Sequence, residues 1–182
     1  MAKLIFNYGA MGSGKSQTLI GTYYNYINLN RTPMVVVPKN QNKIVKSRSG
    51  AEIEAVTIEE FIIMYKKGID VVLVDEAQFL TEDDIEFLSQ TSIKGITVIC
   101  YGLRTASNSK LFPGSKRLME LADIIEELPT LCYYCGHKAR MNIRYVNGII
   151  DKGDNQVVLK SNHNVKYLSV CRKCYYEVLS NF

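Results

Sequence analysis

The sequence predicts an α/β fold with a mainly parallel sheet, and two observations lead to that fold class. Short apolar runs such as MVVV, VVLV and ITVIC are too continuous to alternate, as is typical of strands covered on both faces. Segments with helical periodicity separate these runs along the chain. Near Pro129 the composition changes, because four of the five cysteines follow this residue. We therefore expect a main domain at residues 1–129 and a small C-terminal lobe at 130–182.

The expected strands and helices alternate through the main domain. The strands are expected at residues 3–8, 34–37, 52–56, 70–74 and 95–102. The first helix follows a Gly-rich turn and carries an apolar stripe made of Leu19, Ile20, Tyr23 and Ile27. Thr57 and Glu60 form a capping-box pattern that begins a second helix, expected to end near Gly68. A third helix follows Thr81, and the segments SKRLMELAD and IIEEL complete the domain.

The composition, with 47% hydrophobic and 22% charged residues, is that of a soluble globular protein. The longest apolar runs are far too short to span a bilayer, and the N-terminus leads straight into a motif rather than a signal peptide. We therefore expect a cytoplasmic protein. The net charge is only +4, and small basic groups such as Lys43, Lys46 and Arg48 are interpreted as solvated surface. Because no basic stripe suited to nucleic acid is present, phosphate-containing small molecules are the expected ligands.

Residues 9–16, GAMGSGKS, match the phosphate-loop pattern G-x-x-x-x-G-K-S between a predicted strand and a predicted helix. Such a loop points backbone N–H groups at phosphate oxygens, at the positive end of the helix that follows. Lys15 is expected to reach the β- and γ-phosphates, and the Ser16 hydroxyl to bind Mg²⁺. A plain Gly-rich turn is the alternative, but the complete motif favours nucleotide binding and a fold of the P-loop NTPase type. The expected ATP contacts are Gly9, Ala10, Met11, Gly12, Ser13, Gly14, Lys15 and Ser16.

Two adjacent carboxylates, Asp75 and Glu76, follow the apolar run VVLV. In a P-loop protein, an aspartate at this point supports Mg²⁺ directly or through its water. A second acid is redundant for the metal, so we interpret Glu76 as a base that accepts a proton from the attacking hydroxyl or water. The alternative is that Glu76 only caps the next loop. The pair alone does not distinguish a kinase from an ATPase.

Two C-x-x-C pairs, Cys132 with Cys135 and Cys171 with Cys174, predict a closed structural zinc site of four thiolates. Disulfides are the alternative, and a reducing compartment disfavours them. The remaining Cys100 lies in an apolar strand and is interpreted as a buried small hydrophobe. Both histidines, His137 and His163, are expected on the surface or in loops rather than as ligands. The 35 residues between the two pairs form a loop held at both ends, as is typical of lids.

Four stretches follow one another along the chain. They are GAMGSGKS, then VDEAQFL, then the segment that begins with YGLRT and ends with KLFPGSKRLMELAD, and finally the two cysteine pairs, the second of which lies in YLSVCRKCY. Together, over nearly the whole chain, they resemble the type II thymidine kinases. The resemblance implies transfer of the γ-phosphoryl group of ATP to the 5′-hydroxyl of thymidine, giving dTMP in nucleotide salvage. It also implies a homotetramer and inhibition by dTTP.

The resemblance further implies roles for individual residues. Glu76 matches the general base, and the VDEAQFL stretch adds Asp75, Glu76, Ala77 and Gln78 to the segment that binds ATP and Mg²⁺. The residues that match nucleoside contacts are Met11, Leu103, Thr105, Phe112 and Tyr167. Of these, Tyr167 lies in a loop of the zinc lobe, the lasso, which covers the thymine. The zinc ligands match Cys132, Cys135, Cys171 and Cys174.

This chain departs from the family pattern at three places. Ala106 and Ser107 stand where the family often has Asp-Phe, so one aromatic wall of the pocket is missing. Asn162 and His163 replace a small pair in the lasso, and the Asp-x-Arg common after the second strand is absent. We expect such a pocket to bind thymidine more weakly, or to accept deoxyuridine and bulkier analogues.

Two other functions remain open from the sequence. The DEAQ letters also resemble the Walker B sequence of helicases, which would suit an ATP-driven motor or switch. Against a motor, the chain lacks room for a second motor domain and shows no basic single-strand channel. A zinc protein that senses thymidine nucleotides without turnover is the other alternative.

Overall fold

The computed structural model describes residues 2–65, 68–151 and 164–180. Its largest element in these ranges is a six-stranded sheet with the order β5-β2-β6-β7-β1-β8. Every neighbouring pair in this sheet runs parallel, which confirms the predicted α/β class. The strands are β1 (Leu4–Tyr8), β2 (Pro33–Val37), β5 (Val56–Thr57), β6 (Val71–Val74), β7 (Thr97–Gly102) and β8 (Ile124–Glu127).

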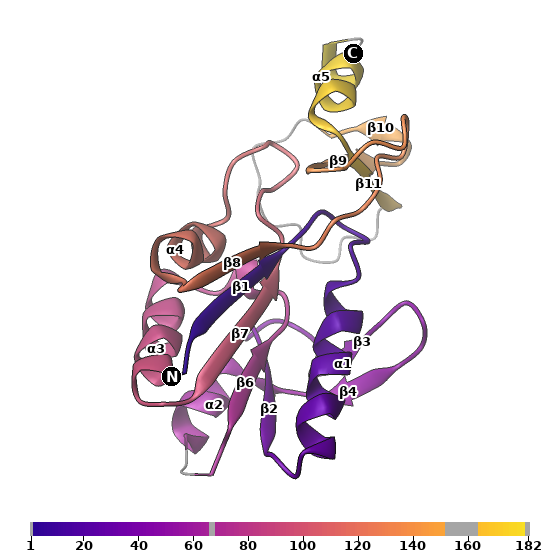
Figure 1. Cartoon of the computed structure of the whole chain (residues 1–182). Helices are drawn as coiled ribbons and strands as arrows, with labels where there is room; N and C mark the ends of the chain where they lie inside the picture. The colour runs from indigo at the N-terminus through magenta and orange to yellow at the C-terminus, as the bar shows by residue number, and fades with distance from the viewer. Residues whose placement is uncertain (1, 66–67, 152–163, 181–182) are drawn as a thin grey trace.

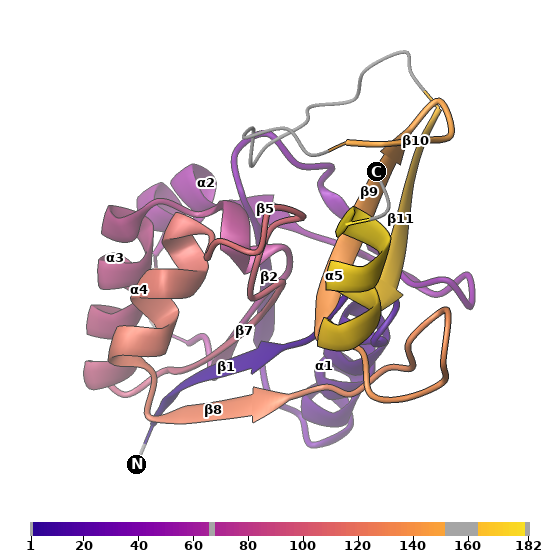
Figure 2. The same cartoon turned by 90° about the horizontal axis from the view of Figure 1, so that it is seen from above.

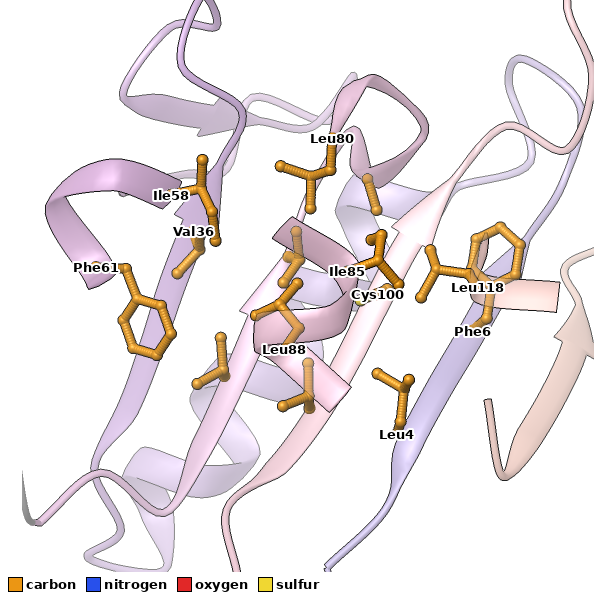
Figure 3. Packing of buried hydrophobic residues seen from close by; sticks show 14 residues of the cluster. Leu4, Phe6, Val36, Ile58, Phe61, Leu80, Ile85, Leu88, Cys100 and Leu118 are labelled. Carbon is orange, nitrogen blue, oxygen red and sulfur yellow. The ribbon is translucent and has the colours of Figure 1, made fainter. Parts of the chain in front are cut away.

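Helices cover both faces of this sheet (Figure 2). On one face lie α2 (Ile58–Met64), α3 (Glu82–Ile93) and α4 (Pro113–Leu121). Their side chains meet the sheet in a closely packed apolar cluster, seen in Figure 3, that includes Phe61, Leu88, Leu118 and Phe6. On the other face, α1 (Lys15–Asn28) packs Leu19 and Ile20 against the sheet, whereas Ile27 of the predicted stripe is exposed. The buried position of Cys100 within the sheet agrees with its interpretation as a small hydrophobe.

The predicted strand at residues 52–56 is wrong as a single element. Residues 52–54 form β4 (Glu52–Glu54), which pairs antiparallel with β3 (Ile44–Lys46) in a separate two-stranded ribbon. Val56 instead begins β5 at the edge of the main sheet. The division follows from packing, because Val45 and Ile53 of the ribbon join the apolar cluster on the α1 face.

The capping box of α2 is confirmed: the Thr57 hydroxyl accepts a hydrogen bond from the Glu60 N–H, and the Glu60 carboxylate accepts one from the Thr57 N–H. The predicted end of α2 near Gly68 is wrong, because the helix ends at Met64. Tyr65 leaves the helical conformation, and its ring packs edge-on against Phe61. This contact adds an aromatic side chain to the cluster beneath α2.

A three-stranded antiparallel sheet with the order β10-β9-β11 lies beyond the carboxyl end of β1 (Figure 1). It consists of β9 (Met141–Val146), β10 (Ile149–Ile150) and β11 (Val165–Val170), and α5 (Arg172–Ser180) packs against it. Ala10 of the phosphate loop belongs to the apolar cluster of this small sheet. None of the described helices has the length and apolar character needed to cross a membrane.

Candidate active site

The phosphate loop connects β1 to α1, and two glycines give it its shape. Gly14 precedes the helix with a φ of 78°, in the left-handed region that favours glycine. A side chain on Gly9 would lie 2.5 Å from the Leu128 carbonyl oxygen, so the backbone passes too close for a larger residue. The loop closes with a hydrogen bond from the Ser13 N–H to the Ala10 carbonyl. This backbone curl leaves the helix N-terminus facing the loop, which is the geometry that binds phosphate.

Lys15, the first residue of α1, folds its side chain back along the loop. Its Nζ lies 3.0 Å from the Ala10 carbonyl oxygen and 3.3 Å from the Ser13 hydroxyl. Burial lowers the pKa of this ammonium, while the charges of Glu76 and Asp75 act to raise it. The side chain is therefore a partly buried cation near two carboxylates, positioned to meet a phosphate in the loop.

Asp75 follows the last residue of β6 and is 6% exposed. Its Oδ2 accepts a hydrogen bond of 3.0 Å from the Ser16 hydroxyl. Burial raises the pKa of Asp75 to about 6, and the charge of Glu76 adds to that rise. A partly buried hydroxyl–carboxylate pair beside a phosphate loop supplies the hard oxygen ligands that Mg²⁺ prefers. The two residues therefore fit a magnesium ion, although they lie 59 positions apart in the sequence.

Glu76 has the left-handed backbone conformation, with φ 52° and ψ 35°, which is uncommon for a residue with a side chain. Its side chain makes no capping hydrogen bond to the short 3₁₀ helix that follows, η1 (Ala77–Phe79). The alternative that Glu76 only caps the next loop therefore finds no support in this contact. Instead, its Oε2 accepts a hydrogen bond from Gln78 Nε2. Strained residues of this kind persist where neighbours hold them and often lie at functional sites.

Gln78 connects Glu76 to the segment predicted to bind a nucleoside. The Gln78 side chain is 1% exposed, and its Oε1 accepts a hydrogen bond of 2.9 Å from the Leu103 N–H. Leu103 follows β7, so this bond joins the ends of two neighbouring strands. Further along, Thr105 and Leu111 form an isolated antiparallel β-bridge. The buried Phe112 ring packs edge-on against Phe79, with 5.5 Å between the ring centroids. The segment is thus fixed to the carboxylate-bearing turn, on the same edge of the sheet.

Two residues that the sequence analysis missed, Asn142 and Ser169, hold the phosphate loop from the small sheet. They lie directly opposite each other on β9 and β11. Asn142 Oδ1 accepts a hydrogen bond of 2.9 Å from the Met11 N–H, and the Ser169 hydroxyl donates one to the Met11 carbonyl. Both backbone groups of Met11 are thereby fixed. No sequence motif marks this contact, because it joins residues more than a hundred positions apart.

Tyr167 shares a face of β11 with Ser169, two residues away. Its side chain is 36% exposed. The lid predicted between the cysteine pairs falls partly on residues 152–163, so Asn162 and His163 lie outside the described residues. Among the predicted nucleoside contacts, Met11 hydrogen-bonds Ser169, which lies two residues from Tyr167 on β11. Leu103 is instead hydrogen-bonded to Gln78, and Phe112 packs on Phe79 of η1.

The sulfur atoms of Cys132, Cys135, Cys171 and Cys174 all lie within 4.8 Å of one another. One pair, Cys135 and Cys171, is 3.6 Å apart, and a tetrahedral ion with ligands at about 2.3 Å requires sulfur separations of about 3.8 Å. None of the four forms a disulfide in this structure. The group can therefore hold a metal ion such as zinc. His137 is exposed, and its carbonyl accepts a hydrogen bond from the Cys132 N–H.

Comparisons with known proteins agree over nearly the whole chain. A family model described as thymidine kinase matches residues 2–175. The chain is 38% identical to a thymidine kinase of Pasteurella multocida over 196 aligned positions, covering 99% of this chain and 100% of that protein. It is 36% identical to a thymidine kinase of Francisella tularensis subsp. holarctica, covering 95% and 96% of the two chains. A relative from Photobacterium profundum, also named thymidine kinase, is 38% identical over 98% of this chain.

The Met11 contact yields a testable expectation for Ser169→Ala. Without the hydroxyl, the Met11 carbonyl loses its partner, and a single hydrogen bond contributes about 0.5–1.5 kcal/mol. We expect the affinity for Mg·ATP to fall roughly two- to tenfold, because the loop is then held less firmly. Isothermal titration would measure the affinity, with Ser180→Ala as the control, since that hydroxyl bonds only within α5. Equal affinities in the two variants would contradict the contact's role.

Proposed function

The chain belongs to the thymidine kinase family, and we infer that it transfers the γ-phosphoryl group of ATP to the 5′-hydroxyl of thymidine, giving dTMP. The observation that carries this function is the match of the family model to residues 2–175. That range includes the phosphate loop, the acidic pair and both cysteine pairs. An ATP-driven motor and a sensor without turnover have no comparable support.

We assign phosphate binding to the loop from Gly9 to Ser16. Its N–H groups and the helix N-terminus would bind the phosphate oxygens, with the Lys15 ammonium directed at the β- and γ-phosphates. Ser16 and Asp75 would hold Mg²⁺, which when bound neutralises charge on the phosphates. Ala77 and Gln78 would support this site through the turn after Asp75, since Gln78 hydrogen-bonds Glu76.

We assign the general base to Glu76. The bond between the γ-phosphorus and the bridging oxygen of ATP breaks, a bond to the thymidine 5′-oxygen forms, and the 5′-hydroxyl proton passes to the Glu76 carboxylate. The hydrogen bond from Gln78 would orient that carboxylate, and its half-buried position leaves it accessible to a substrate. Because the same Gln78 side chain binds the Leu103 N–H, the base and the nucleoside segment would move together.

The nucleoside is proposed to lie between two walls. Met11 and Tyr167 would form one, and Leu103, Thr105 and Phe112 the other. Phe112 already packs against Phe79, which supports a rigid second wall. Ala106 and Ser107 remove one aromatic side chain from that segment, so weaker thymidine binding or tolerance of bulkier analogues is still the prediction.

The four cysteines are proposed to bind a structural zinc ion and to organise residues 130–182 as a lobe beside the kinase domain at 1–129. Their sulfur separations fit a closed tetrahedral site. The ion would tie the segment before β9 to the start of α5, and so fix both ends of the loop that carries the lasso. A homotetramer, inhibition by dTTP and a cytoplasmic location remain predictions from the resemblance.

The kinase proposal is tested by ATP consumption with a panel of deoxynucleosides and a reaction without acceptor. We expect thymidine to be the best acceptor, because the family match covers the whole site, and consumption without acceptor to be far slower. A coupled assay for ADP measures both. Rapid consumption without acceptor would instead indicate an ATPase, and a higher rate with deoxycytidine or deoxyguanosine would reject thymidine as the substrate.

The base assignment predicts that Glu76→Gln lowers kcat by about 10²–10⁴-fold, because the amide does not accept the 5′-proton. Mg·ATP affinity should change little, since the loop and Ser16 are untouched. Steady-state kinetics and titration measure the two quantities. Glu126→Gln, on the exposed part of β8, is the matched control and should retain normal turnover. Near-normal kcat in Glu76→Gln would remove this residue from the mechanism.

The zinc proposal predicts about one zinc ion per chain, measured by elemental analysis of the purified protein. Chelation should disorder the small sheet and reduce thymidine affinity, because the ends of the lasso are then released. Cys174→Ser should lose the metal, whereas Cys100→Ala should retain it, since Cys100 lies in the main sheet. Metal-free protein with full activity would contradict the structural role of the ion.

A further inference from the structure

The segment between β7 and α4, which carries the proposed second wall of the nucleoside pocket, forms a loop that is closed in two places. Thr105 and Leu111 form a β-bridge across its middle. At its base, the hydroxyl of Ser115 in the first turn of α4 donates a hydrogen bond of 2.5 Å to the Leu103 carbonyl. Ser115 is fully buried. A single buried side chain therefore joins the two ends of this loop.

The direction of the Ser115 hydroxyl is unusual for a serine in a helix. Serine and threonine hydroxyls in helices commonly donate to a carbonyl three or four positions earlier in the same helix. Five hydroxyls in the described helices do so, namely those of Thr18, Thr22, Thr91, Ser92 and Ser180. Ser115 instead reaches a carbonyl 12 positions earlier, outside its own helix. Its hydroxyl is thus directed at the nucleoside segment.

Both backbone groups of Leu103 are held by buried side chains. The Leu103 N–H donates to Gln78 Oε1 at 2.9 Å, and its carbonyl accepts from Ser115. Met11, in the other proposed wall, is held in the same way by two side chains of the small sheet. Each proposed wall of the pocket therefore contains one residue whose N–H and carbonyl are both fixed by side chains from other segments.

Two glycines let the first turn of α4, the turn η1 and the end of β7 approach one another closely. A side chain on Gly114 would lie 2.6 Å from the Ala77 carbonyl oxygen and 2.7 Å from that of Leu80. A side chain on Gly102 would lie 2.8 Å from Gln78 Oε1. Distances this short exclude any larger residue without a shift of the backbone or of Gln78. The start of α4 therefore packs directly against the turn that follows the acidic pair.

These contacts form one continuous path from the proposed base to α4. Gln78 donates to Glu76 and accepts from Leu103, and Leu103 accepts from Ser115. We propose that Ser115 is a positioning residue for the acceptor nucleoside, an inference that rests on the proposed kinase function. By holding the Leu103 carbonyl, Ser115 sets where the second wall lies relative to the Glu76 carboxylate. It acts through Leu103, and none of its own atoms is exchanged in the transfer.

The expected effect is on kcat more than on KM. Attack of the 5′-oxygen and transfer of its proton to Glu76 depend on alignment, and a misplacement of about 1 Å costs on the order of 10²-fold in rate. Apolar contact between the Leu103 side chain and a nucleoside is non-directional, so it tolerates a small displacement of the wall. An interaction that matters mainly in the transition state lowers kcat when it is removed.

The test compares Ser115→Ala with Ser92→Ala, a matched control. Ser92 is also a buried helical serine, but its hydroxyl donates to the Ser89 carbonyl within α3. We expect Ser115→Ala to lower kcat for dTMP formation about 10- to 100-fold, with little change in the KM for thymidine or in Mg·ATP affinity. Ser92→Ala should keep normal kcat, even where thermal unfolding shows a comparable loss of stability. Equal kcat in the two variants, or a raised KM without a fall in kcat, would overturn the proposal.

A second measurement needs no turnover. Hydrogen exchange of the amides in residues 103–112, followed by mass spectrometry, should be faster in Ser115→Ala than in Ser92→Ala or the unmodified protein, because the base of the loop is released. Unchanged exchange in this segment would also overturn the proposal. Absence of thymidine-dependent ADP from the unmodified protein would instead reject the kinase function, and the exchange result distinguishes that failure from failure of the Ser115 contact.

Discussion

Parallel pairing of β6, β7 and β1 is the constraint on which the rest of the site depends. Because the three strands lie side by side and run the same way, their carboxyl ends meet at one edge of the sheet. That edge receives the acidic pair from β6, the Leu103 segment from β7 and the phosphate loop from β1. The strand β6 is fully buried, so its apolar residues fix where Asp75 emerges. The placement of the proposed catalytic residues is thus a consequence of sheet register.

The site brings three charged side chains together in a partly buried position. Hydrogen bonds from neighbouring groups stabilise each of them there. Asp75 is buried with a raised pKa, Lys15 is partly buried with a lowered pKa, and Glu76 adopts a strained backbone conformation. Each is unfavourable alone, and each is held by a specific partner: Ser16 for Asp75, the loop carbonyls for Lys15, and Gln78 for Glu76. Polar groups held in this way are already oriented before a substrate arrives, which is the condition for electrostatic stabilisation of a transition state.

Local signals in the sequence were enough to predict most helices and strands of the main domain. The features that the sequence did not predict depend on contacts between residues far apart in the chain. The Thr57–Glu60 capping box and the continuous apolar strands are encoded within a few residues, and the structure confirms them. The ribbon was missed because residues 52–56 have one uniform pattern, while Ile53 packs on α1 and Val56 joins the sheet. Asn142 and Ser169 carry no motif, since their role comes only from the Met11 backbone that lies opposite them in the folded chain.

The phosphate loop is held by parts of the chain that lie far from it in the sequence. Met11 is held by Asn142 and Ser169 from the small sheet, and the adjacent Gly12 is faced by Arg48 from the ribbon. The loop motif supplies the curl and the helix N-terminus, but its neighbours are built by segments about 35 and 130 positions away. A nucleotide bound in the loop would lie beside both parts of the chain that flank it. Cys132 and Cys174 pack in the apolar cluster of the small sheet, so the proposed metal site and the phosphate loop would be linked through Met11.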